Sequence, residues 1–320
     1  MKSFSRENAI FLLALCAAFS AAAVSLALVS SPRRAADSKI VGFIAQKSNN
    51  VEQRSVGNPI WSQIDAKYPV YDRDTVRTGP SSSATINLGD GVEIAMSEQS
   101  MVFIDVSQEK KRLRVSGGLV SVSNARKSSP VRLETRAGSI EVKEGNVQLR
   151  DSIGGMNVEL RDGEASVTTD GETVTLSEPS ILDTASSEVR TISAELIKPG
   201  QGDVVLIHSP GERFSMAWNC ADNDGARIMI ARDANFERVE VDEIARGSSF
   251  AATLPEGLHY WKIADKSPVQ WFSVAIARAP RQIAPVNVAF TYLDALPVIS
   301  FLWSEVDIAE EYRFEVFSSE

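Results

Sequence analysis

The sequence predicts an all-β protein with four parts: a β-roll or solenoid-like unit, an immunoglobulin-like β-sandwich, a partial second sandwich and one N-terminal transmembrane helix. Two observations predict the strands. Apolar and polar residues alternate with a period of two along most of residues 40–274, as they do in strands with one buried face. Long amphipathic runs with the helical period are missing from the same region.

An uncharged run near the N-terminus predicts the helix. Ala9–Ser31 holds 23 residues without a charge, which at about 1.5 Å per residue can cross a bilayer core of roughly 30 Å. This length favours a retained signal anchor, with residues 1–8 in the cytoplasm and the bulk of the chain in the periplasm. Two alternatives stay open: a signal peptide cleaved near Ala21–Ala23, and a lipoprotein modified at Cys16.

Residues 36–182 are expected to form the first folded domain. Glycine turns at positions 91, 118, 138 and 163 each separate two short alternating strands, at spacings of 27, 20 and 25 residues. Repeats of this length are typical of stacked rungs, each of which buries its apolar face on the next. The polar stretch that follows predicts a linker over residues 183–196.

A second repeat covers the C-terminal part of the chain. Three alternating apolar side chains at 214, 216 and 218 recur 85 residues later and end at Trp303. About seven short strands fit into one such period, which suits an immunoglobulin-like sandwich. We therefore expect one module over residues 197–280 and the start of a second over 281–320. Either the natural chain continues beyond Glu320, or the partial module pairs with the first module or with another protein. The strand ending in Trp218 and the Gly-x-x-Tyr-Trp strand at 257–261 resemble fibronectin type III-like modules of bacterial surface proteins.

Two tryptophans are interpreted as core residues. Trp218 is expected to pack against Ile228, Tyr260 and Trp261, because two copies of one fold must repeat their core spacing. Trp61 is expected to be buried beneath the start of the first domain rather than to bind a ligand.

The most distinctive motif lies in residues 71–100. It combines turn residues with alternating apolar positions, and its members are Asp74, Val76, Thr78, Gly79, Ser82 or Ser83, Ala84, Ile86, Leu88, Asp90, Gly91 and Ser100. This pattern resembles the FecR domain of bacterial envelope proteins, over a stretch from about Val41 to Gly118. Arg73 stands where the family usually has glycine, so the turn before Asp74 is expected to differ in type.

Composition excludes several classes of partner. The formal net charge is −9, and an acidic chain repels nucleic acid. Cys220 is the one cysteine outside the apolar run, so no internal disulfide is expected in the exported part. The two histidines, His208 and His259, have no partner cysteine pair, so we expect no zinc site.

No residues suggest catalysis or cofactor binding. Asp222-Asn223-Asp224-Gly225 lacks the downstream glutamate of a calcium loop and suits a turn between strands. The basic cluster at 110–114 is interpreted as a solvated hairpin face, and the serines at 81–83 have no adjacent base. We expect no enzyme activity, no cofactor and no metal, and the binding residues stay unknown.

Two functions follow from these expectations. The first is a non-enzymatic, membrane-anchored envelope protein whose β domains bind envelope proteins or peptidoglycan. The second is the role implied by the FecR resemblance, a transmembrane regulator that controls a sigma factor. The eight residues before the apolar run are too few to form a helical sigma-binding domain, which favours the first function.

Overall fold

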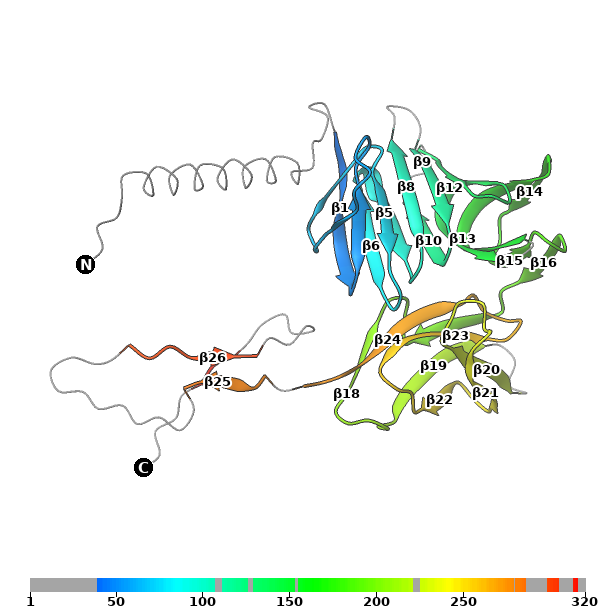
Figure 1. The fold of residues 1–320 in the computed structure, drawn as a ribbon. Helices are drawn as coiled ribbons and strands as arrows, with labels where there is room; N and C mark the ends of the chain where they lie inside the picture. The colour runs from blue at the N-terminus through cyan, green and yellow to red at the C-terminus, as the bar shows by residue number, and fades with distance from the viewer. Residues whose placement is uncertain are drawn as a thin grey trace, which may run out of the picture.

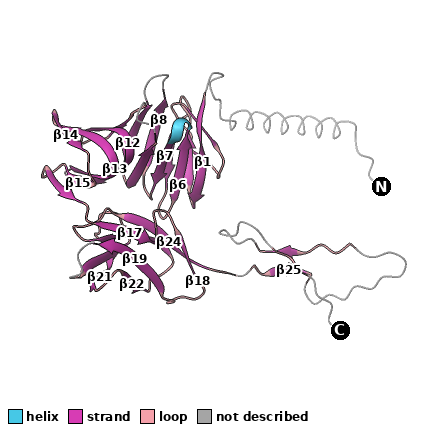
Figure 2. Cartoon of the chain, turned by 180° about the vertical axis from the view of Figure 1, so that it is seen from behind, coloured by secondary structure: helices cyan, strands magenta, loops and turns pink. Residues whose placement is uncertain are grey.

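The computed structural model describes residues 39–106, 111–125, 129–152, 155–220, 225–278, 280–285, 298–304 and 313–315. Within them, β-strands make up all of the regular structure except a short 3-10 helix at Gly89–Gly91 (Figure 2). The predicted all-β class is therefore confirmed. The helix predicted over residues 9–31 lies outside the described residues. Among the described ones, no helix has the length and apolar character needed to cross a membrane.

The first folded unit is a single sheet of sixteen strands. They are β1 (Ile40–Ser48), β2 (Val51–Arg54), β3 (Ser62–Gln63), β4 (Pro69–Tyr71), β5 (Thr75–Thr78), β6 (Ser83–Leu88), β7 (Val92–Met96), β8 (Met101–Val106), β9 (Lys111–Ser116), β10 (Leu119–Asn124), β11 (Val131–Glu134), β12 (Ser139–Ser152), β13 (Gly155–Thr169), β14 (Glu172–Leu176), β15 (Ser180–Asp183) and β16 (Glu188–Thr191).

The long strand β12 makes this sheet fold back on itself. Its residues 139–142 pair with β11, whereas its residues 145–150 pair with β10. One half of the sheet, β2-β5-β8-β9-β11, continues from the first stretch, and the other half, β10-β7-β6-β1, continues from the second. The two halves share one apolar core.

Period-two patterning explains which side chains reach this core. Ile44, Ile86, Ile94, Val122 and Val147 are successive cross-strand partners on β1, β6, β7, β10 and β12, and none of them is exposed. The residues between them in sequence face outward, so the same five strands also display a polar outer surface.

The expected solenoid-like stack of rungs is wrong. Rungs of a solenoid would stack in parallel, whereas the described pairings of this sheet are antiparallel except for β9 with β11. The glycines differ in their roles. Those at 91 and 138 turn antiparallel hairpins, the one at 118 joins β9 to β10 in the other half, and Gly163 lies within β13. A similar spacing of glycines therefore did not mean a repeating structural unit.

The linker expected over residues 183–196 is also not a linker. Strand β15 ends at Asp183 and pairs with β16, which extends the first unit to Thr191. The next unit begins at Ala194, where the first of its strands starts. Short polar strands at a sheet edge resemble linker sequence, because neither of their faces needs to be apolar.

The second unit consists of two sheets around a separate core. Its three-stranded sheet has the order β17-β19-β22 and its five-stranded sheet the order β18-β24-β23-β20-β21. The bounds are β17 (Ala194–Lys198), β18 (Val204–Ile207), β19 (Phe214–Cys220), β20 (Ala226–Ala231), β21 (Val239–Ala245), β22 (Ser249–Ala252), β23 (Gly257–Ile263) and β24 (Gln270–Ile276). This two-sheet unit is called the sandwich below.

The sandwich core confirms most of the packing expected for Trp218. The side chain is 1% exposed and belongs to the same apolar cluster as Ile228 and Trp261. Tyr260 is the exception, because neighbouring residues of a strand face opposite sides. It packs instead in a different cluster with Leu119 of the first unit.

A short hairpin follows the sandwich and repeats its first strand pair. In β25 (Gln282–Ala284) and β26 (Leu302–Trp303), Gln282 opposes Trp303. Leu196 opposes Trp218 in the same way in β17 and β19, and a bulge follows in both pairs. The 85-residue repeat found in the sequence therefore extends to the register in which the strands pair. Residues 286–297, 305–312 and 316–320, which would carry more of the second module, lie outside the described residues.

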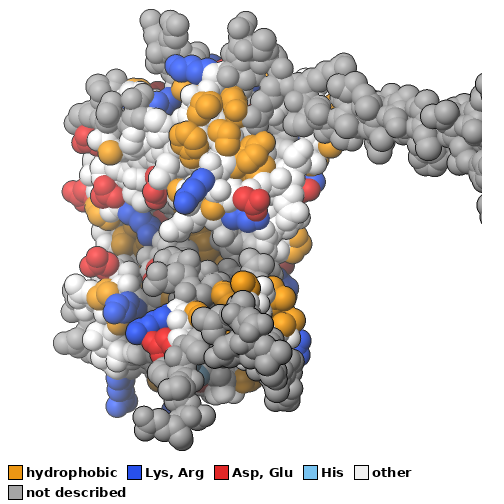
Figure 3. Space-filling model, turned by 90° about the vertical axis from the view of Figure 1, so that its left-hand side faces the viewer, with side chains coloured by type: hydrophobic (Ala, Val, Ile, Leu, Met, Phe, Trp, Pro, Cys, Tyr) orange, Lys and Arg blue, Asp and Glu red, His pale blue; other side chains and the backbone are white. Residues whose placement is uncertain are grey.

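The two units lie one above the other, with β18 and β24 of the sandwich below β6 and β10 of the first unit (Figure 1). Hydrophobic side chains gather on the side of the first unit that Figure 3 presents. Exposed large apolar residues on β1 are Ile40 and Phe43, at 48% and 50% exposure.

Candidate functional site

The polar residues of the 71–100 motif hold turns in place. Asp74 is buried and accepts hydrogen bonds from the side chain of Gln53 and the backbone of Tyr71. Thr78 is buried as well; its hydroxyl donates to the carbonyl of Ser97 and accepts from the backbone N–H of Ser100. These bonds satisfy polar groups that burial would otherwise leave without partners. The motif therefore identifies a fold.

Two turn positions, one in the motif and one beyond it, have backbones that suit glycine. Arg73 has a φ of 63°, so it adopts the left-handed conformation that glycine takes at little cost. The turn therefore has the backbone that a glycine would favour, despite the different residue. At Gly118, φ is 57° and an added Cβ would lie 2.5 Å from the backbone carbonyl oxygen of Glu98, so a larger residue would require the backbone to shift.

The junction between the two units is built on an apolar cluster. Leu119 of β10 packs with Leu258, Tyr260, Val269 and Trp271 of the sandwich, and all five are at most 4% exposed. The Tyr260 hydroxyl hydrogen-bonds to Ser97 and to the backbone of Glu98, and burial raises the pKa of Tyr260. The two units therefore share a buried interface of the kind found inside a domain.

A polar cluster centred on Glu159 completes this junction. Gln148 Nε2 donates to Glu159 Oε2 at 2.7 Å and to the carbonyl of Val269 at 2.6 Å. The backbone N–H of Val269 also donates to Glu159 Oε2, at 3.1 Å. Arg161 Nη2 donates to Gln148 Oε1 at 3.1 Å and to the Val269 carbonyl at 3.2 Å. Through these bonds, the outer faces of β12 and β13 bind the turn before β24.

The charges in this cluster are held away from water. Burial raises the pKa of the Glu159 carboxyl, although Arg150 and Arg161 oppose the shift. Burial lowers the pKa of Arg161, and Glu159 opposes that shift. Arg150 contributes a further bond across the junction, from Nη1 to the carbonyl of Ala234 at 2.6 Å. Charges buried in this way depend on their partners for stability.

A groove of about 360 Å³ opens beside the junction, on the polar outer surface of the first unit. Its floor comes from β1, β6, β7, β10 and β12. Arg161 of β13 and Gln201, in the turn after β17, also line it. A second hollow of about 610 Å³ also touches Arg161 and is lined by the junction residues 192–196. Both hollows therefore involve the junction of the two units.

The opposite outer face of the first unit is charged, and three of its arginines share one carboxylate. The carboxylate of Glu134 lies 3.3 Å from Arg112, 3.6 Å from Arg132 and 4.0 Å from Arg114. All three arginine side chains are about half exposed. In the described part of the basic cluster at 110–114, Arg112 and Arg114 lie on a solvated, ion-paired face as expected, whereas Lys111 is buried, which the sequence did not predict.

Other residues singled out by sequence show no site chemistry. Trp61 is not buried in the core; the guanidinium carbons of Arg77 and Arg54 lie 4.0 and 4.7 Å from its ring centre. Ser82 is buried and its hydroxyl donates to the carbonyl of Pro80. Residues 222–224 of the considered calcium loop lie outside the described residues. Among the described ones, no cluster of histidine, cysteine and carboxylate side chains could hold a metal.

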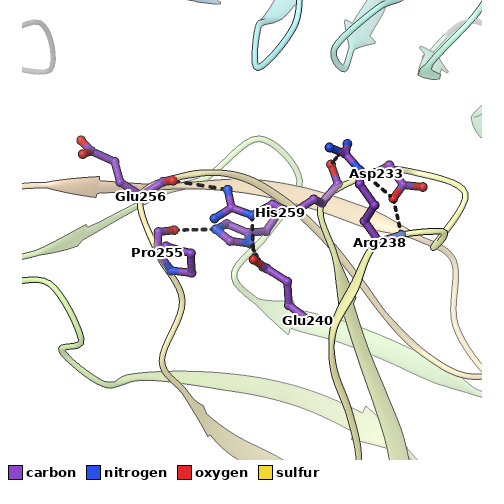
Figure 4. A network of polar contacts seen from close by, with 7 residues as sticks. Asp233, Arg238, Glu240, Pro255, Glu256 and His259 are labelled. Carbon is purple, nitrogen blue, oxygen red and sulfur yellow. Dashed lines mark hydrogen bonds and ion pairs between the residues drawn. The ribbon is translucent and has the colours of Figure 1, made fainter.

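A buried histidine gives the sandwich a titratable group that sequence reasoning missed. Figure 4 shows His259 between Pro255 and Glu240. Its Nε2 lies 2.8 Å from the Pro255 carbonyl and its Nδ1 lies 2.8 Å from Glu240 Oε2. Arg232 Nε binds the other oxygen of Glu240 at 2.8 Å. Burial lowers the pKa of His259, Arg232 adds to the shift, and the Pro255 and Glu240 contacts oppose it.

We expect the sandwich to lose stability as the pH falls. With its folded pKa below the ordinary value of 6.5, His259 binds fewer protons when folded than when unfolded. The stabilisation is therefore present above about pH 6.5 and is lost as the pH falls through the folded pKa. Urea unfolding between pH 5 and 8 would measure this, with His259→Gln as the comparison. An identical pH dependence in the variant would contradict the assignment.

The chain can also be compared with known proteins. Residues 74–166, from Asp74 into β13, match the family model described as FecR protein. The match covers less than a third of the chain. An uncharacterized protein of Treponema pallidum (strain Nichols) is 25% identical over 300 residues. The match covers 85% of this chain but 45% of that protein. The chain thus spans less than half the length of this curated relative.

Two solved structures are similar to part of this chain. Both are of a protein of Parabacteroides distasonis ATCC 8503 assigned as an anti-sigma factor, determined at 1.65 and 2.50 Å. They are 12% and 13% identical, cover 42% of this chain and 77% of their own, and have a TM-score of 0.33. Similarity at this level supports no argument about the function of this chain.

Proposed function

We propose that this chain is a FecR-type regulator of envelope signalling, which acts by binding and not by catalysis. The match of residues 74–166 to the FecR family carries the proposal. It favours the regulator over the general envelope scaffold that the sequence alone had favoured. The buried junction supports it further, because a ligand that contacts both units would be coupled to the packing of each.

The finer parts of the proposal rest on the sequence. The uncharged run at 9–31 supports attachment to the cytoplasmic membrane, with the β units on the periplasmic side. The three- and five-stranded sheets around one core support a fibronectin type III-like module in the sandwich. The net charge of −9 argues against nucleic acid, and the proposed partners are envelope proteins or peptidoglycan.

Transcript profiling would test the regulatory role. Deletion of the gene is expected to change the expression of a small set of genes that share a promoter element, because a regulator of a sigma factor acts at defined promoters. Complementation with the intact chain is expected to restore expression.

A matched variant tests the membrane attachment. Replacing residues 1–38 with a cleavable signal peptide would still export the β units but release them, and it is expected to fail in complementation. An unchanged transcriptome in a deletion strain with a weakened envelope would overturn the regulator and favour the scaffold.

A further inference from the structure

The backbone of most of the groove floor is already hydrogen-bonded within the sheet. The inner floor strands are paired on both sides: β6 with β1 and β7, β7 with β10, β10 with β12, and β12 with β13. The outermost strand, β1, pairs with β6 along the groove and with β4 at Ile40–Phe43. An extended peptide usually binds by adding a strand to a free edge, and β6, β7, β10 and β12 offer none. A ligand that lies across these strands must be recognised by side chains.

Those side chains form an unusually neutral, hydrogen-bonding surface. Amides come from Gln46, Asn87, Asn146 and Gln201, and hydroxyls come from Thr85, Ser121 and Ser123. The charges are one carboxylate, Glu93, and one guanidinium, Arg161, which balance each other. The opposite face of the same unit carries exposed, ion-paired arginines instead. Amides and hydroxyls both donate and accept hydrogen bonds, so the groove suits a ligand rich in both kinds of group.

The side chains line up across the sheet in two rows. In one row, Gln46, Thr85, Ala95 and Ser121 are successive cross-strand neighbours. In the other, Asn87, Glu93, Ser123 and Asn146 are successive neighbours. With strands about 4.8 Å apart, the floor from β1 to β12 is roughly 19 Å wide. The groove therefore presents repeated polar contacts to an extended ligand.

One residue of the sandwich points to a missing partner. Neither polar atom of the Gln201 amide has a hydrogen bond, although both are buried. Unsatisfied buried amides are rare and call for an explanation. Gln201 lines the groove, so a ligand seated there would provide partners for the amide and would touch both units at once.

We propose that this groove binds a neutral saccharide chain. The chain would lie across β1, β6, β7 and β10, with its hydroxyl or acetamido groups bonded to the two rows and to Gln201. The only apolar side chains of the lining are Ala45 and Ala95, so the groove has no pockets for the side chains of a peptide. The same lining lacks an aromatic platform, so binding to short oligomers is weak and binding to long polymers is stronger through multiple contacts. This proposal rests on the proposed function only in assuming that the exported part binds an envelope component.

Binding of defined oligosaccharides to the full chain in detergent micelles tests the proposal. The probes are a hexamer of N-acetylglucosamine and a hexamer of glucose, which distinguish acetamido from hydroxyl recognition. Either probe is expected to slow amide hydrogen exchange in β6, β7 and β10. Retention on insoluble N-acetylglucosamine polymer or on cellulose gives a second readout.

Substitutions in the groove make the test specific. The double variant Asn87→Arg, Ser123→Arg places two long cations across the floor at positions that are not in the core, and it is expected to weaken retention at least tenfold. Gln201→Ala is expected to weaken it several-fold. Arg132→Ser, on the opposite face, is the matched control and should bind like the unmodified chain. Because hydrogen exchange on the unmodified chain needs no variant, the proposal stays testable if a variant folds poorly.

Three results would overturn the proposal: no retention and no protection with either saccharide, retention that the groove variants do not change, or protection of the floor strands by peptides but not by saccharides. These binding measurements are independent of transcription. A failure here would leave the regulatory proposal in place, and an unchanged transcriptome would leave saccharide binding in place.

Discussion

Trp218→Ala is expected to destabilise the sandwich by about 3–5 kcal/mol, the usual cost of truncating a buried tryptophan and leaving a cavity. Trp218 is 1% exposed and packs with Met216, Ile228 and Trp261 between the two sheets. A domain commonly has about 5–15 kcal/mol in total, so the variant would keep little of its stability. Urea unfolding of the chain, followed by hydrogen exchange in β19, β20 and β23, would measure the loss.

Trp303→Ala is the natural control for this prediction. Trp303 holds the equivalent position in the repeated strand pair but is 39% exposed, so its truncation is expected to cost less than about 1 kcal/mol. Equal effects of the two substitutions would contradict the assignment of Trp218 to the core.

Because of the buried junction, Trp218→Ala should also affect the first unit. Two modules joined by a flexible linker would unfold independently. Instead, Leu119 is fully buried beneath Tyr260 and Trp271, so loss of the sandwich exposes apolar surface on the first unit. We expect exchange in β10 and β12 to rise in Trp218→Ala as well, by less than in the sandwich.

Sequence alone predicted what depends on local alternation. The strand around Ile86 and the core position of Trp218 both follow from a period of two. The same pattern could not predict how strands far apart in the chain pair, so a sheet folded about β12 was mistaken for a stack of rungs. It also could not place the polar groove, whose residues are ordinary outward-facing positions until the sheet brings them into rows.

The junction escaped prediction although the sequence held a signal for it. In β23, the four consecutive residues 258–261 are all buried, because Tyr260 faces the first unit while Trp261 faces the sandwich core. Bulky residues on both faces of a strand are typical of a strand covered on both sides. No such signal marks the polar residues of the junction, Gln148, Glu159 and Arg161, because polar side chains on an outer face are usually solvated.

Glu159→Ala is expected to loosen the junction by about 3–5 kcal/mol, the cost of removing one partner of a buried charged cluster. The substitution removes the acceptor of Gln148 Nε2 and of the Val269 N–H. It also leaves the buried Arg161 without the carboxylate that offsets its desolvation. Faster hydrogen exchange in residues 267–271 and in β12, with little change in the sandwich core, would show a weakened junction between folded units.

Glu159→Gln separates the charge of this residue from its shape. Burial raises the folded pKa of Glu159 above the ordinary value of 4.5, so the folded state binds more protons than the unfolded state in that range. The pH-dependent part of the contribution of Glu159 to stability is therefore fully present below about pH 4.5 and is lost as the pH rises through the folded pKa. Glutamine has the same size and one acceptor oxygen but does not titrate.

The difference in unfolding free energy between Glu159→Gln and the unmodified chain should then change with pH. The stability of the variant should increase relative to that of the unmodified chain as the pH rises. A difference that stays constant from pH 4 to 8 would show that Glu159 is solvated, and the junction would then be open in solution.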